Sequence, residues 1–129
     1  MKTILMSCIV IYNLIFIPYN TFAQNINDKD KEELIIQFLE PYYLMALKKH
    51  FGNLYNISTQ CERLIEIKRE PDRPKVFTVE AKTMTFEGAH NPPHYSVTII
   101  VSNKEDVFNF KLINYKVEKT QPGTTCQNY

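Results

Sequence analysis

The sequence predicts an α+β domain in which one N-terminal helix packs on a four-stranded antiparallel meander. Three observations favour this fold class. Apolar residues recur at helical spacing over residues 28–51, four later segments alternate apolar and polar side chains, and short turn-forming stretches separate those segments. A sheet with one apolar face needs a cover, so the helix is expected to lie across that face.

The expected helix spans residues 28–51. Asp28 can cap its N-terminus, and Gly52 can end it. Pro41 lies inside this region and is expected to kink the helix or to begin a second one, because proline lacks the N–H that a helix interior uses. The apolar positions that follow the helical repeat are Leu34, Ile35, Phe38, Leu39, Tyr42, Met45 and Ala46.

Four strands are expected after the helix. Residues 63–69 form the first, and residues 75–87 form the second, where a change of apolar parity near Thr83 predicts a bulge. Residues 95–101 alternate strictly, and residues 108–117 change parity once more, which predicts a second bulge. The connections are expected at residues 70–74, 88–93 and 103–106. This arrangement is similar in outline to the cystatin-like fold, a likeness that implies nothing about activity.

The N-terminus has the order of a secretory signal peptide. A positively charged start, a mostly apolar stretch and the small residue Ala23 follow one another, and the stretch is shorter than the roughly 20 apolar residues of a membrane span. The expected organisation is a signal peptide at 1–23 and one domain at 24–129 that ends in a tail at 120–129. The protein is therefore expected to be secreted or envelope-associated, with no stable membrane span after cleavage. Retention of the signal as an anchor stays open.

Charge and composition exclude several classes of function. Lys and Arg total 15 against 14 Asp and Glu, and removal of Lys2 with the signal leaves 14 of each sign. This balance argues against nucleic acid as a partner, because phosphate binding is driven by Lys and Arg. The hydrophobic fraction of 44% is typical of a globular chain. The chain also lacks a G-x-S-x-G nucleophile motif, which favours a protein that is not an enzyme.

Signal cleavage would remove Cys8 and leave two cysteines, Cys61 and Cys126. An even number of cysteines in a small exported domain favours a disulfide. The bridge would tie the C-terminal tail to the beginning of the sheet. Two unpaired thiols remain the alternative.

The most distinctive segment connects the second and third strands. Gly88 frees the backbone and the two prolines stiffen the end of the segment, so this loop is expected to be rigid. A rigid, polar loop on a small scaffold indicates a binding surface for an unknown extracellular ligand or envelope component. The residues expected to form it are Gly88, His90, Asn91, Pro92 and Pro93.

Two other functions compete with this hypothesis. His90 with Glu87 or His94 could ligate a transition metal, in a metal-binding protein or a metal-dependent enzyme. However, the prolines preclude the helix that would place both histidines on one face, and a rigid connection with solvated or hydrogen-bonded histidines explains the same residues. A cystatin-type inhibitor ranks last, because its Q-x-V-x-G hairpin motif is missing. We therefore expect no metal and no cofactor.

The chain also resembles a known family. The motifs that carry the resemblance are Leu39-Glu40-Pro41-Tyr42, Phe77-Thr78-Val79, the run from Thr85 to Pro93, and Ile113-Asn114-Tyr115-Lys116. They are similar to those of an uncharacterised family of small exported proteins from spore-forming Gram-positive bacteria, the domain of unknown function with serial number 3888. The resemblance covers about residues 30–118. It implies an exported bacterial protein, and it assigns no activity, cofactor or catalytic residue.

Overall fold

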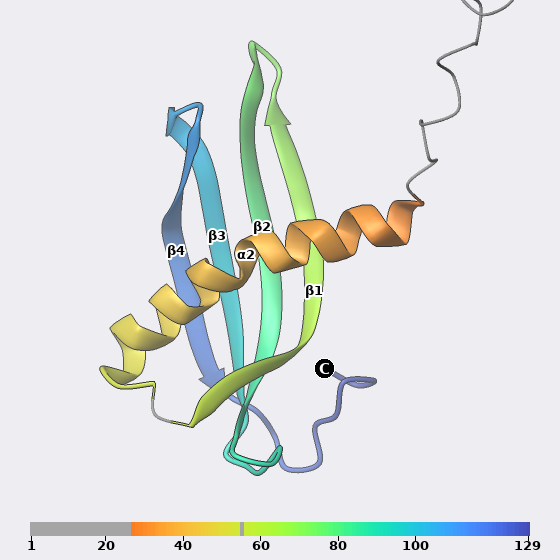
Figure 1. The fold of residues 1–129 in the computed structure, drawn as a ribbon, viewed down its shortest axis with the longest axis vertical. Coiled ribbons are helices and arrows are strands. Elements are labelled where there is room, and N and C mark those ends of the chain that lie inside the picture. The colour runs from red at the N-terminus through yellow and green to blue at the C-terminus, as the bar shows by residue number, and fades with distance from the viewer. Residues whose placement is uncertain (1–26, 55) are drawn as a thin grey trace, which may run out of the picture.

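The computed structural model describes residues 27–54 and 56–129. Its strands form one antiparallel sheet in the order β1-β2-β3-β4, and the helix lies across one face of that sheet (Figure 1). The predicted α+β class, with one helix on a four-stranded meander, is confirmed. The expected signal peptide lies outside the described residues. The elements are α2 (Asp28–Phe51), β1 (Ile57–Glu70), β2 (Arg73–Glu87), β3 (Tyr95–Asp106) and β4 (Asn109–Lys119).

Helix α2 has the bounds that the sequence predicts, with one difference at its start. The capping side chain belongs to Asn27, whose Oδ1 accepts a hydrogen bond of 2.8 Å from the N–H of Asp30, and not to Asp28. Gly52 ends the helix with a φ of 77° and donates its N–H to the carbonyl of Lys48. The helix runs through Pro41 as one element. Among the described residues, no helix is long and apolar enough to cross a membrane.

The core lies between α2 and the face of the sheet that it crosses. Along the helix, buried positions recur at intervals of three and four residues, which places them in one stripe. Along β2 and β3, every second side chain points toward that stripe. The fully enclosed cluster consists of Leu39, Tyr43, Ala46, Leu47, Val79, Ala81, Val97, Ile99 and Val101.

Strand β1 is longer than the sequence predicts. It begins at Ile57, six residues before the expected start at residue 63, and its first residues pair with the end of β2. The expected start was wrong because the polar run Ser58-Thr59-Gln60 carries no apolar alternation. These residues are held in the sheet by main-chain pairing instead. The turn between β1 and β2 lies within the expected residues 70–74.

The predicted irregularity near Thr83 is present, but the extra residue belongs to the neighbouring strand. Gln60 and Arg63 of β1 form regular pairs with β2 on either side of the irregularity. Cys61 and Glu62 therefore both lie opposite the single residue Thr83. Thr83 is fully buried and donates its hydroxyl to the carbonyl of Gln60 at 3.0 Å. A second shift in β1 and the predicted one in β4 add further irregularities, and such bulges increase the local twist of a sheet.

The hairpin between β3 and β4 corrects another expectation. Residues 103–106 were expected to form its turn, but β3 continues to Asp106 and the turn comes after it. Asn103 is 3% exposed, accepts the N–H of Phe77 at 2.7 Å and donates to the carbonyl of Lys75 at 2.9 Å. An asparagine that is typical of turns is here a buried hydrogen-bonding group that joins β2 to β3.

Candidate functional site

The loop that the sequence singled out is closed by main-chain hydrogen bonds. Glu87 and Asn91 exchange two of them, of 3.0 and 2.9 Å. Gly88 and His90 both adopt positive φ, at 51° and 62°, a conformation that is easy for glycine and uncommon for histidine. The loop therefore has a defined backbone shape.

Both histidines near this loop make contacts inside the protein. The ring of His90 stacks on Phe86 with centroids 4.1 Å apart, and its Nδ1 lies 2.9 Å from Oε1 of Gln60. The Nδ1 of His94 lies 2.8 Å from the carbonyl oxygen of Thr85, and it must be the donor because a carbonyl only accepts. These contacts explain the histidines as braces of the connection between β2 and β3.

The structure does not assemble the alternative metal site. Within the described ranges 27–54 and 56–129, no group of three or more His, Cys, Asp and Glu side chains is placed to hold a metal ion. Glu87, His90 and His94 are all in these ranges and do not form such a group of three. A metal-dependent function therefore has no support from this loop.

Cys61 and Cys126 do come together. The sulfur atoms of Cys61 and Cys126 lie at disulfide distance, with Cα atoms 5.2 Å apart, as the sequence favours. Arg63, two residues beyond Cys61, donates to the main-chain oxygen of Cys126 and, at 2.7 Å, to that of Tyr129. The C-terminal tail is thus fixed to β1 next to the bulge.

The end of this tail lies against the two central strands, β2 and β3. The hydroxyl of Tyr129 donates to the carbonyl of Thr83 and lies 3.4 Å from the hydroxyl oxygen of Ser96. The Nζ of Lys82 lies 4.2 Å from the centroid of the Tyr129 ring, a cation–π contact. Met84 is only 2% exposed, although it shares its strand face with Lys82, which indicates that the tail covers this part of the sheet.

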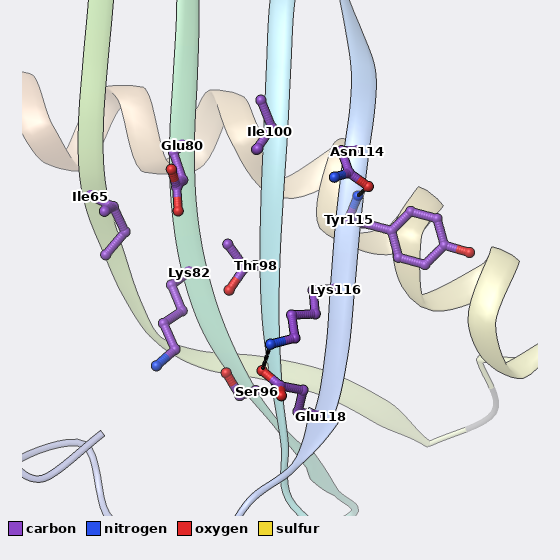
Figure 2. A pocket seen from close by; sticks show the side chains of 10 residues that line it. All are labelled: Ile65, Glu80, Lys82, Ser96, Thr98, Ile100, Asn114, Tyr115, Lys116 and Glu118. Carbon is purple, nitrogen blue, oxygen red and sulfur yellow. Dashed lines mark hydrogen bonds and ion pairs between the residues drawn. The ribbon is translucent and has the colours of Figure 1, made fainter.

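The face of the sheet that α2 leaves uncovered contains a hollow of about 510 Å³ (Figure 2). Its lining residues come from all four strands. Apart from Tyr115, whose side chain packs against the core, they sit on the opposite side of the sheet from the core, because neighbours along a strand alternate between faces. Sequence reasoning did not name this surface, although the polar positions between the core residues are its signal. The lining residues are Ile65, Glu80, Lys82, Ser96, Thr98, Ile100, Asn114, Tyr115, Lys116 and Glu118.

The lining of this open-face hollow balances its charges. Two carboxylates and two ammonium groups take part, and Lys116 and Glu118 form an ion pair of 2.9 Å. Figure 2 shows the side chain of Thr98 near the centre of the hollow, Ile100 toward one end, and Ser96 beside Glu118 toward the other. Such a surface offers hydrogen-bond donors and acceptors with little net charge.

Shared residues connect the open-face hollow to the predicted loop. A second hollow of about 320 Å³ shares Lys82, Ser96 and Glu118 with the first and is completed by the tail. A third, of about 360 Å³, shares part of the tail with the second and includes Pro92 and Pro93 of the loop. The loop and the uncovered sheet face therefore form parts of one continuous surface.

A separate hollow of about 240 Å³ lies between α2 and β1. Tyr43, on its helix side, is 1% exposed, and its hydroxyl has no hydrogen-bond partner among the described residues. Burial, followed by the nearby Glu62 carboxylate and Tyr129, raises the pKa of the Tyr43 hydroxyl far above its usual value. The residues that line this hollow are Ile36, Gln37, Glu40, Tyr43, Thr59 and Glu62.

Comparison with known proteins identifies the family. The family model described as protein of unknown function (DUF3888) matches residues 31–119, from the first turn of α2 to the end of β4. The tail that carries Cys126 and Tyr129 lies beyond the match. No curated protein and no solved structure shows significant similarity to the chain. The chain belongs to the DUF3888 family, and the fold and surfaces described above are those of one of its members.

Proposed function

We propose that this protein is an exported or envelope-associated binding module without catalytic activity. Its ligand is a polar polymer of the cell wall, which lies in the open-face hollow and extends toward the loop at residues 88–94. The observation that carries the proposal is the hollow itself: about 510 Å³ on the side of the sheet that α2 does not cover. Concave surfaces of this size with convergent polar groups are typical of ligand sites.

The chemistry of the lining supports binding rather than turnover. The ten residues of the open-face hollow include hydroxyl, amide, carboxylate and ammonium groups but neither histidine nor cysteine. A polyanion is disfavoured because Glu80 and Glu118 offset Lys82 and Lys116. A neutral or zwitterionic chain with many hydrogen-bonding groups fits this charge balance, and the expected signal peptide would bring the protein to such a chain.

Co-sedimentation with purified cell-wall sacculi tests the proposal. We expect the protein to sediment with the sacculi and Thr98→Tyr, which fills the centre of the hollow, to weaken this binding by about tenfold or more. The matched control is Lys111→Tyr, which places the same side chain outside the hollow and is expected to bind normally. Thermal unfolding of both variants checks that the fold is intact. Equal binding by Thr98→Tyr and the unchanged protein, or no sedimentation at all, contradicts the proposal.

A further inference from the structure

The hollow between α2 and β1 gathers polar groups that the proposed binding on the open face does not use. Two carboxylates, an amide, a threonine and a buried phenol come from helix residues 37–43 and from the start of β1. We propose that this hollow binds a small organic ammonium ion, with Glu62 and Glu40 as its counter-charges and the Tyr43 hydroxyl as a hydrogen-bond partner. This inference goes beyond the proposed function and concerns the other side of the sheet.

The two carboxylates of this hollow have no ion-pair partner among residues 27–54 and 56–129. Neither Glu40 nor Glu62 takes part in any of the seven ion pairs found among the described residues. No Lys or Arg lines the hollow. Glu62 has one contact with a hydroxyl, that of Thr83 at 3.5 Å, which is too long to be strong. The hollow therefore presents two negative charges that a cation can satisfy.

The buried hydroxyl of Tyr43 independently points to a ligand. A buried polar group without a partner destabilises the folded state, so native proteins seldom leave one unpaired. Tyr43 lines the hollow together with Glu62, and after burial the Glu62 carboxylate is the next largest cause of the raised pKa of the Tyr43 hydroxyl. An ammonium group seated between this carboxylate and the phenol would donate to both oxygens.

An organic ammonium ion fits the donor and acceptor inventory better than other small ligands. Its three N–H groups can donate to carboxylate, phenol and amide oxygens, and Glu62, Tyr43 and Gln37 supply one of each. An anionic ligand would be repelled by the carboxylates. A bare metal ion would leave most of the hollow of about 240 Å³ unfilled, and the described residues contain no cluster of three ligand side chains.

The experiment is a titration of the ¹⁵N-labelled full chain with n-butylamine, which is an ammonium ion near neutral pH, and with n-butanol as the uncharged control. We expect saturable shifts of amide signals around the hollow with n-butylamine only. Glu62→Gln is expected to weaken this binding by about tenfold, because it removes a charged hydrogen-bond acceptor. Glu66→Gln changes the same residue type on the same strand outside the hollow and is expected to bind n-butylamine normally.

A second pair of variants protects the test against loss of fold. Glu40 is solvent-exposed, so Glu40→Gln is expected to fold normally and to weaken binding by several-fold. Tyr43→Phe is expected to weaken binding while the protein stays folded. The inference is overturned if n-butanol shifts the same signals as n-butylamine, if n-butylamine causes none, or if Glu62→Gln and Glu40→Gln bind as the unchanged protein does. None of these results bears on sedimentation with sacculi, so failure of one proposal leaves the other standing.

Discussion

The two faces of the sheet are built from the same strands and are covered in different ways. One face is covered by α2, whose side chains Leu39, Tyr43 and Leu47 are almost completely buried against it. The other face is covered only near its end, by a tail that is fixed through the Cys61–Cys126 pair and a few hydrogen bonds. The covered face is a core, and the uncovered part of the other face is a polar hollow. The difference shows that alternation along a strand can place an apolar core on one face of a small sheet and a polar surface on the other.

The first prediction tests the face that α2 covers. Leu47→Ala is expected to lower the free energy of unfolding by about 2–5 kcal/mol, because it empties a fully buried position. Urea unfolding measures this loss. Leu44→Ala removes the same side chain from a helix position that is 38% exposed, so a much smaller loss is expected there. Equal losses in the two variants would contradict the assignment of the core.

The second prediction tests the face that the tail covers. Cys126→Ser removes a cross-link that spans 65 residues, which the chain-entropy model values at about 4 kcal/mol. Cys61→Ser removes the same cross-link and is expected to lose a similar amount. Hydrogen exchange in either variant should rise in the tail and change little in α2. Rapid exchange throughout the helix would mean that the tail also supports the core.

The third and smallest effect concerns Tyr43 and the decrease in the free energy of unfolding at alkaline pH. Tyr43→Phe removes a buried hydroxyl without a partner, so the free energy of unfolding at neutral pH is expected to stay equal or to rise by about 1 kcal/mol. The pKa of this hydroxyl is raised in the folded state, chiefly by burial. The unfolded chain therefore releases the proton first, and Tyr43 lowers the stability as the pH rises above about 10.

Urea midpoints at about pH 8 and pH 11 isolate this contribution of Tyr43. The unchanged protein should lose more stability between the two values than Tyr43→Phe, since lysines and the other tyrosines are common to both. Burial also raises the pKa of Tyr129, so part of the alkaline loss should persist in the variant. Parallel losses in the two proteins would show that the hydroxyl of Tyr43 is not held in an environment that disfavours its charge.

Regular patterns in the sequence were sufficient to predict most of the fold. Helical spacing together with the capping signals at both termini placed the ends of α2, and strict alternation over residues 95–101 placed the centre of β3. The pattern failed where main-chain pairing or a single side chain decides the structure. The polar start of β1 has no apolar alternation that would predict a strand. Asn103 is a residue type common in turns, although its side-chain amide is buried among carbonyl and N–H groups.

The candidate sites were harder to predict than the fold. The loop at residues 88–94 was singled out from its composition, and the structure uses its histidines as braces. The open-face hollow depends on the curvature of the sheet, and the hollow near Tyr43 depends on which face Glu62 takes. Both depend on bulges, and the number of extra residues in each strand is set by pairing over long sequence distances.

The bulge at Cys61 and Glu62 also determines which side chains of β1 face the helix. Ile57 and Thr59 before it, and Leu64 after it, all contact the helix side, although their numbers differ in parity. Deletion of one residue between them would exchange inward and outward positions for the whole start of the strand. Ile57 would then no longer pack against the core. The fold therefore constrains the number of residues in this part of β1.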